Sequence, residues 1–306
     1  MPMDWLEKKI DAIARDRSHG AAQLATSAIK ILLSVCKRCS GKDLEQLLSA
    51  VRQTALSLAK VRPSMAAIRN WSLVFSQRFH QKINDTTSFS EAQQQGILLG
   101  EELLAQQQSF IELQVKAARA LLKNCKSLLT LSYSSTVESI LRYGLPSSCR
   151  LVIAESRPLM EGRRLFKNLE HIFADLRMIT DAQMGLAIPN TDLVLVGADT
   201  ILADLAVVNK AGTYLSALVA HTHSRDFFVA ADTYKINAAV DSGNCVLESK
   251  SGSELWPQRE KHCDNVYFDI TPAKFISGFI TEEGIRDVAG MKPYVQKWKE
   301  LYQELA

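Results

Sequence analysis

The chain has 306 residues, of which 47% are hydrophobic and 23% charged, and this composition predicts a globular protein of about two domains. Its 36 basic and 33 acidic residues give a net charge of +3, without the concentrated basic surface of a nucleic-acid-binding protein. No stretch approaches the roughly 18 apolar residues of a membrane span, and the first residues do not resemble a targeting signal. We therefore expect a cytoplasmic protein with no membrane or direct nucleic-acid partner.

The first 125 residues predict a helical domain. Two apolar stripes recur at helical spacing and are expected to be core: Leu24, Ala28, Ile31, Leu32 and Val35, and then Leu99, Leu103, Phe110, Ala117 and Leu121. Ser88 and Glu91 have the spacing of a capping box, so a long helix should begin there and continue to about Lys123. Pro63 separates two earlier helical segments.

The six cysteines are too sparse for a secreted disulfide scaffold. Cys36 and Cys39 form a single C-x-x-C inside a helical pattern, without a second pair or a nearby histidine. We therefore predict no metal site, no redox motif and no cofactor.

Near residues 124–127 the pattern changes from helical spacing to short apolar runs, and we place a domain boundary at 125. Domain one is then 1–125, and domain two, 126–306, is of the α/β class. Strands are expected at 128–133, 150–154, 176–180, 193–196 and 227–231, with helices between them. This alternation predicts βαβ units and a parallel sheet covered on both faces. No G-x-G-x-x-G follows any strand, which argues against a nicotinamide or flavin site.

A polar cluster follows each of the first four strands. The clusters are S-Y-S-S-T at 132–136, E-S-R-P-L-M-E-G at 155–162, T-D-A at 180–182, and G-A-D at 197–199 followed by N-K-A-G-T at 209–213. In an open parallel sheet these positions line one crevice beyond the carboxyl ends of the strands. The sequence therefore predicts a site for a polar ligand.

Each candidate residue has a functional and a structural interpretation. Ser134 and Ser135, with Thr136, would lie in the first turn of a helix, where they bind an anion or merely cap the helix. Arg157 can grip phosphate or carboxylate, or form a surface ion pair. Asp199 is a candidate general base or a helix cap. Asn209 and Lys210 orient substrate oxygens, or cap and solvate the next helix.

Several longer motifs resemble one family. They are G-A-D-T-I-L-A-D-L-A-V-V-N-K-A-G-T, E-S-R-P-L-M-E-G, A-D-T-Y-K-I-N, V-Y-F-D-I-T-P and F-I-T-E-E-G, with weaker similarity at His19-Gly20-Ala21 and Arg62-Pro63-Ser64. The sequence is identified as a member of the family that joins the alpha, beta and delta regulatory subunits of eukaryotic translation initiation factor 2B to two sugar-phosphate isomerases. These act on ribose 1,5-bisphosphate and methylthioribose 1-phosphate.

The resemblance implies a helical N-terminal domain and a Rossmann-like parallel-sheet domain of the NagB/RpiA/CoA-transferase-like class, with a homodimer or larger homo-oligomer formed largely through the second domain. A segment rich in apolar residues, 264–284, is expected to supply a partner surface. The ligand-binding positions would be His19, Gly20, Arg62, Ser134, Ser135, Arg157, Gly162, Asn209 and Lys210.

Three departures separate this chain from the isomerases. In those enzymes a cysteine at the end of the first strand acts with the aspartate of G-A-D; here Asp199 is present, but Ser132 stands in place of the cysteine. His19 replaces a usual arginine, and Asp204-Leu205 replaces Asn-Gly, which puts phosphate affinity and loop geometry in doubt.

The local sequence is closer to the regulatory subunits. We therefore predict a regulatory or scaffold protein without isomerase activity, with a pocket for a phosphorylated sugar or a nucleotide and a translation-factor partner where the source organism has one. Two alternatives stay open. One is an aldose-ketose isomerase that uses Ser132, and the other is a structural subunit without a ligand.

Overall fold

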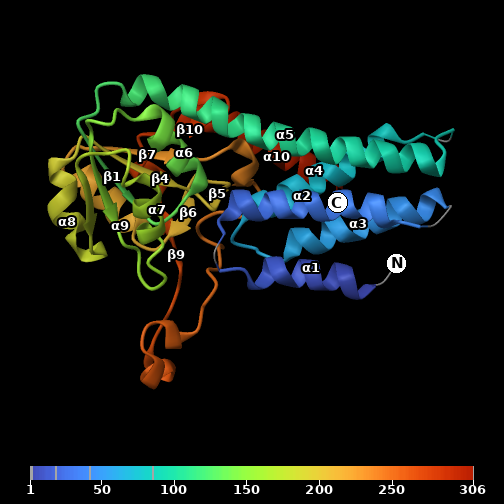
Figure 1. Ribbon diagram of the computed structural model, residues 1–306, viewed down its shortest axis with the longest axis horizontal. Helices are drawn as coiled ribbons and strands as arrows, with labels where there is room; N and C mark the ends of the chain where they lie inside the picture. The colour runs from blue at the N-terminus through green and yellow to red at the C-terminus, as the bar shows by residue number, and fades with distance from the viewer. Residues whose placement is uncertain (1–2, 18, 41–42, 85, 306) are drawn as a thin grey trace. The chain divides into compact units, whose positions relative to one another are not determined.

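The computed structural model describes residues 3–17, 19–40, 43–84 and 86–305 (Figure 1). The chain divides into two compact units, one made of residues 1–109 and 301–306 and the other of residues 110–300. No helix in the described part of the chain is long and apolar enough to span a membrane.

The first unit is helical, as predicted. It contains α1 (Met3–Arg15), α2 (Ala21–Arg38), α3 (Leu44–Lys60), α4 (Ala66–Lys82), the first part of α5 (Phe89–Leu122) and the end of α10 (Val288–Leu305). The apolar stripe of α2 is fully or almost fully buried. The capping box is also confirmed, because Glu91 accepts the Ser88 N–H at 2.8 Å while the Ser88 hydroxyl accepts the Glu91 N–H at 3.3 Å.

The helix α5 belongs to both units. Its early stripe residues Leu99 and Leu103 are buried, and Ala117 and Leu121 pack at the edge of the core of the second unit. The compact units divide after Ser109, within this helix, whereas the change from helix to sheet falls between Leu122 and Ser127. The boundary expected at 125 therefore marks the change of secondary structure.

The second unit contains a seven-stranded sheet in the order β11-β10-β7-β4-β1-β2-β3. The strands are β1 (Ser127–Leu131), β2 (Arg150–Ala154), β3 (Leu176–Ile179), β4 (Leu193–Gly197), β7 (Asp226–Ala230), β10 (Gly278–Thr281) and β11 (Gly284–Arg286). Only β11 is antiparallel to its neighbour. All five predicted strands are present and parallel, so the α/β class is confirmed.

The helices α6 (Ser135–Gly144) and α7 (Gly162–Leu169) follow β1 and β2 of this sheet, and α9 (Thr213–Thr222) precedes β7. One apolar core joins α6, α7 and the last turns of α5 to the sheet, through residues such as Ile140, Leu165, Ala118 and Leu195. The helix α9 contacts β4 and β7 elsewhere on this sheet. The short helix α8 (Met184–Ala187) leads into β4.

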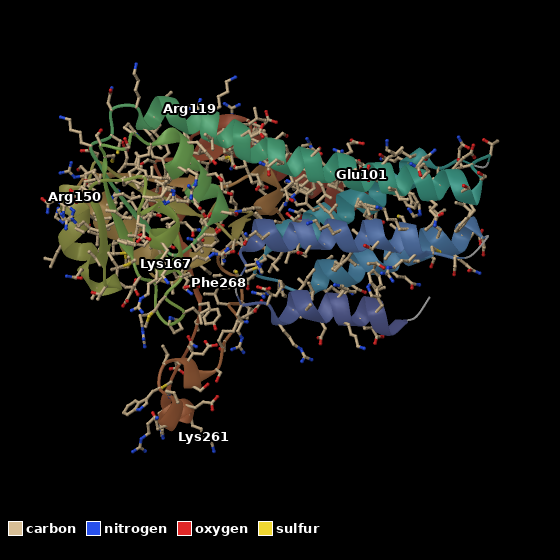
Figure 2. The ribbon with its side chains drawn as sticks, viewed as in Figure 1. Glu101, Arg119, Arg150, Lys167, Lys261 and Phe268 are labelled. Carbon is tan, nitrogen blue, oxygen red and sulfur yellow. The ribbon has the colours of Figure 1, made fainter. Side chains whose placement is uncertain are left out.

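A second, four-stranded sheet was not predicted. Its order is β8-β5-β6-β9, from β8 (Ile236–Asn237), β5 (Thr200–Leu202), β6 (Val207–Lys210) and β9 (Phe268–Thr271). These strands have two to four residues, too few to show a periodic pattern in the sequence. Between β8 and β9 the chain forms an extension that carries Lys261 near its end and leads away from the sheets (Figure 2).

The apolar segment 264–284 does not form the exposed surface that we expected. Phe279 and Ile280 are completely buried, and Phe268, Tyr267 and Ile276 are nearly so, because β9 and β10 place them inside the unit. Only Val266 is more than one third exposed among the large apolar residues of this segment. Its hydrophobicity is explained by the core of this chain and is not evidence for a partner surface.

Candidate functional site

The carboxyl ends of β1 and β2 have unusual backbone conformations. Ser132, directly after β1, has φ 64°, and Ser156 and Met160, after β2, have φ values of 63° and 56°. Non-glycine residues rarely adopt left-handed φ values, and such strain is often stored at functional sites. The sequence clusters S-Y-S-S-T and E-S-R-P-L-M-E-G therefore lie, as predicted, at the carboxyl ends of β1 and β2, and each contains residues with a constrained backbone conformation.

The serines after β1 begin helix α6. Ser134 is the N-cap residue, and its hydroxyl accepts the Val137 N–H at 3.4 Å. The capping interpretation is thus confirmed for Ser134. Ser135 is the first helical residue and is half-buried. The first-turn N–H groups and the positive end of the helix dipole still favour an anion at this position.

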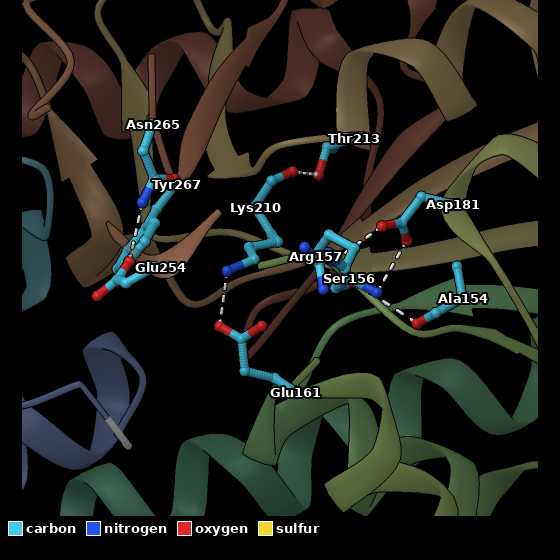
Figure 3. A network of polar contacts seen from close by, with 10 residues as sticks. All are labelled: Ala154, Ser156, Arg157, Glu161, Asp181, Lys210, Thr213, Glu254, Asn265 and Tyr267. Carbon is cyan, nitrogen blue, oxygen red and sulfur yellow. Dashed lines mark hydrogen bonds and ion pairs between the residues drawn. The ribbon is translucent and has the colours of Figure 1, made fainter. Parts of the chain in front are cut away.

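The turn after β2 is held by an aspartate from the next cluster along the sheet. Asp181 accepts the backbone N–H groups of Ser156 and Arg157, each at 2.8 Å (Figure 3). This carboxylate, from T-D-A, fixes the backbone from which the Arg157 side chain extends. Arg157 is exposed, so its guanidinium is accessible to a ligand in solution.

A buried cation follows at Lys210. Its side chain is only 5% exposed, and its Nζ lies 2.7 Å from Oε1 of Glu161 and 4.7 Å from the centre of the Tyr267 ring (Figure 3). The other carboxylate oxygen of Glu161 is buried and has no hydrogen-bond partner among the described residues. Lys210 belongs to β6 and is not a solvated cap, so the structural alternative for this residue is wrong.

Neighbouring Asn209 is also buried, and its amide donates to the Thr213 hydroxyl at 3.0 Å. The helix after it, α9, is capped from elsewhere: Asp269 of β9 accepts the N–H groups of Gly212 at 2.7 Å and Tyr214 at 3.0 Å. Burial raises the pKa of Asp269 to about 6, and its second oxygen has no hydrogen-bond partner in the described chain.

Asp199 follows β4 and precedes β5, so it begins no helix and the helix-cap alternative is wrong. Its N–H donates to the carbonyl of Val208, and the residue is half-buried. The preceding carbonyl, that of Ala198, accepts a hydrogen bond at 2.7 Å from the ammonium of Lys235, which is 3% exposed. A second buried lysine therefore bonds the backbone of the residue that precedes the candidate general base.

Lys235 belongs to a buried group of charges. Asp232 has its pKa raised by burial, an effect that Lys235 opposes, and Glu282 has its pKa raised to about 7 by burial and by Asp232. The Glu282 carboxylate accepts the N–H of Thr233 at 3.0 Å. The site residues that our sequence reasoning missed are Lys235, Glu161 and Asp269. All three lie in the motifs quoted for the family, as charged residues beside apolar ones.

Two glycines permit close approach of the backbone. A Cβ on Gly162 would lie 2.1 Å from the Ala154 carbonyl oxygen, so α7 can begin against β2 only with glycine there. A Cβ on Gly197 would lie 2.8 Å from the Ser134 hydroxyl. Gly162 thus has a packing role, and its predicted contact with a ligand stays a prediction.

The loop at Asp204-Leu205 keeps the conformation that the family's Asn-Gly would favour. Leu205 has φ 65° although it is not a glycine. Asp204 accepts the N–H of Ala206 at 3.3 Å and also bonds the Ser242 hydroxyl and N–H, and the bonds with Ser242 and Ala206 lower its pKa, against a desolvation effect that raises it. The substitution therefore leaves the positive φ in place.

Three of the predicted ligand-binding residues belong to the first unit. His19 is exposed, and its Nδ1 lies 2.8 Å from a carboxylate oxygen of Asp16. Arg62 is buried, its Nη1 donates to the Asp16 carbonyl at 2.8 Å, and its Nε has no hydrogen-bond partner among the described residues. Gly20 is the N-cap of α2. Their contact with a ligand stays a prediction.

The C-x-x-C lies at the end of α2. Burial, with a smaller effect of Cys39, raises the pKa of Cys36 to about 12, which leaves that thiol unreactive. Within the described ranges, no three histidine, cysteine, aspartate or glutamate side chains are grouped to hold a metal ion.

Comparison with known proteins agrees with this architecture. The model of the Initiation factor 2 subunit family matches residues 17–287. A provisionally named eIF-2B subunit 2-like translation initiation factor of Pyrococcus horikoshii is 33% identical over 89% of this chain and 92% of its own. The ribose 1,5-bisphosphate isomerase of Methanocaldococcus jannaschii is 26% identical over 97% of this chain and 96% of its own.

Among solved structures, the translation initiation factor eIF-2B of Pyrococcus horikoshii superposes with a TM-score of 0.78 at 32% identity. The superposition covers 93% of this chain and 97% of that one. The relatives thus include both eIF-2B-like proteins and a phosphosugar isomerase.

Proposed function

We propose, since the chain belongs to the Initiation factor 2 subunit family, that it is an eIF-2B-like regulatory or scaffold protein that binds a phosphorylated sugar or nucleotide without isomerising it. The observation that carries this proposal is Ser132, which stands where the isomerase resemblance requires a cysteine. A hydroxyl is far less acidic than a thiol and needs an adjacent base to replace it.

The surroundings of Ser132 support the absence of turnover. The residue is buried, and in the described chain no side chain hydrogen-bonds its hydroxyl. A base within hydrogen-bond reach is the first geometric requirement for activating a serine. Asp199 remains as a carboxylate partner, but a proton relay between neighbouring sugar carbons needs two groups.

Ligand binding is supported by the cations near the strand ends. Lys210 and Lys235 are buried ammonium groups, Arg157 is an accessible guanidinium, and the first turn of α6 offers N–H groups. Lys210 is already paired with Glu161, so a ligand anion would be bound mainly by Arg157 and by the first turn of α6. A phosphate is the anion that this set of donors favours.

Thermal shift measurements test the binding. The panel contains ribose 1,5-bisphosphate, methylthioribose 1-phosphate and adenosine monophosphate, and a ligand at 100 times its Kd should stabilise the fold by about 2.7 kcal/mol. We expect Arg157→Ala to remove the rise in melting temperature. Arg177→Ala is the matched control, since Arg177 is 65% exposed on β3 and bonds Asp175. Equal shifts in wild type and Arg157→Ala would count against this site.

Turnover is tested by proton NMR with the two isomerase substrates. The wild-type protein should show little or none, since one positioned acid or base typically contributes about 10²–10⁴-fold in rate. In a Ser132→Cys background, any activity gained should disappear with Asp199→Asn.

The second candidate is an aldose-ketose isomerase, favoured by the Lys235 ammonium, which bonds the carbonyl of Ala198 directly before Asp199, and by the isomerase relative, whose match covers 97% of this chain. Robust wild-type turnover that is lost in Ser132→Ala would establish it in place of our proposal.

Assembly is the remaining part of the proposal. We expect a homodimer or larger oligomer and, where the source organism has it, a translation-factor partner. Light scattering decides the first point, because a concentration-independent monomer of 34.0 kDa would contradict it.

A further inference from the structure

Two cysteines lie together at the amino ends of neighbouring strands of the large sheet. The polar clusters lie at the other, carboxyl ends of these strands. Cys125 precedes β1 by two residues, and Cys149 directly precedes β2. Their Sγ atoms are 4.0 Å apart. The strands themselves are paired in parallel, with Ser127 opposite Arg150.

The two thiols are chemically different. Cys125 is half-buried, whereas Cys149 is 1% exposed. The Cys149 S–H donates to the Cys125 sulfur, and this hydrogen bond lowers the pKa of Cys125, while burial and, to a smaller extent, the negative charge of Asp192 oppose the change. The same hydrogen bond, followed by burial, raises the pKa of Cys149. The accessible sulfur is thus the one that forms the thiolate more readily.

The backbone holds this pair in place. Asp192 accepts the N–H of Lys126 at 2.7 Å and of Ser127 at 3.0 Å, and the Arg150 N–H donates to the Lys126 carbonyl at 2.9 Å. With Ser127 opposite Arg150, Cys149 is one residue out of register with Cys125. Their sulfur atoms, 4.0 Å apart, must approach to about 2.05 Å to form a disulfide.

We propose that Cys125 and Cys149 are a modification site at which a peroxide forms a disulfide between β1 and β2. The Cys125 thiolate attacks a peroxide oxygen, the O–O bond breaks, and a sulfenic acid and hydroxide form. Cys149 then gives up its proton, and its sulfur attacks the Cys125 sulfur and displaces the hydroxyl as water. Overall, two thiols and hydrogen peroxide give one disulfide and two water molecules, a two-electron oxidation of the cysteines.

The disulfide would close a loop between residues 24 positions apart in sequence. That loop contains β1 and α6, and with them Ser132 and Ser134. A cross-link restricts the unfolded chain, so oxidation should stabilise the second unit. The inference does not depend on which ligand binds at the other edge of the sheet.

The experiment treats the folded full-length protein with hydrogen peroxide, blocks the remaining thiols by alkylation and maps the peptides by mass spectrometry. We expect a linked Cys125–Cys149 peptide that is two hydrogen atoms lighter than its parts and disappears on reduction. The oxidised protein should melt roughly 5 °C higher than the reduced protein.

Cys125→Ser should lose both the linked peptide and the gain in melting temperature. Cys39→Ser, at the C-x-x-C of the first unit, is the matched control and should keep both. Because Cys149 is buried, Cys149→Ala serves as a second variant, in which Cys125 should oxidise further to the sulfinic acid. A wild-type protein that shows only sulfinic acid at Cys125, or a linked peptide only after denaturation, would overturn the proposal.

Discussion

The two sheets of the second unit bury different kinds of side chain. The strands β1, β2, β4, β7 and β10 of the large sheet contribute mainly Leu, Val, Ile, Ala and Phe to the core. The small sheet buries Asn209, Lys210 and Asn237 among its apolar residues, with Asp269 in β9 largely enclosed. The large sheet is built for stability, whereas the small sheet holds groups whose burial costs free energy.

This difference has a physical basis. Burying apolar surface stabilises a fold by roughly 25 cal/mol per Å², whereas a buried charge must be paired to avoid a penalty of several kcal/mol. Lys210 meets this requirement through Glu161, and Asp269 meets it in part through two backbone N–H groups. Substitutions in the two sheets should therefore have different signatures.

The largest effect is expected from Leu195→Ala in β4, a completely buried residue of the large sheet. The substitution removes buried methyl groups, which loses their hydrophobic transfer free energy, and it leaves a cavity. Together these effects should lower the free energy of unfolding by about 2–5 kcal/mol. Urea denaturation measures this change. If the protein remained as stable as the wild type, the large sheet would not be the main source of stability.

A smaller effect is expected from Glu161→Gln, which leaves the Lys210 ammonium without its carboxylate. A fully buried pair costs about 3–5 kcal/mol when one partner is removed. Glu161 is 26% exposed, so we expect a loss of about 1–3 kcal/mol. The double variant with Lys210→Met should be more stable than Glu161→Gln alone. A double variant that is less stable would show that the ion pair is not the cause.

The third prediction concerns pH. The pKa of Asp269 is about 6 in the folded protein, against an ordinary value of 3.8. The folded state therefore binds a proton that the unfolded state has released, and stability should fall as pH rises from about 4 to about 6. The decrease is on the order of 1–3 kcal/mol.

Asp269→Asn should flatten this part of the stability profile, measured by urea denaturation at several pH values. Glu282→Gln is the comparison variant, because the contribution of Glu282 extends from its ordinary pKa of 4.5 to about 7, and this variant alone should flatten the decrease above pH 6. An unchanged slope between pH 4 and 6 in Asp269→Asn would contradict the assignment.

The smallest effect compares one threonine in each sheet. Thr130 in β1 and Thr271 in β9 are completely buried, and neither hydroxyl oxygen has a hydrogen-bond partner among the described residues. Valine removes the unpaired hydroxyl at nearly constant volume, so Thr130→Val and Thr271→Val should each stabilise the protein by about 1 kcal/mol. Thermal denaturation measures both. A loss of stability in Thr271→Val alone would show that the small sheet hydrates this position.

The same contrast explains what could be predicted. Five of the seven strands of the large sheet were found from sequence. The strands β2, β4 and β7 each contain four consecutive apolar residues, a pattern that indicates a buried parallel strand, whereas β10 and β11 were missed. The small sheet was missed since β5, β6, β8 and β9 are too short for such a pattern. The segment 264–284 was misinterpreted because a buried strand and an exposed apolar surface have the same composition.

For the candidate site, the sequence by itself determined the family and the location of polar clusters after the strands, and it showed that Ser132 replaces the expected cysteine. It could not decide between a cap and a ligand group at Ser134, Asp199 or Lys210, since the alternatives differ only in what the side chain contacts. Those contacts come from residues distant in the chain: Glu161 lies 49 positions from Lys210, and Lys235 lies 37 positions from Ala198. Local sequence sets backbone preference and apolar pattern, whereas the charge and hydrogen-bond environment of a side chain depends on which distant strands the fold brings beside it.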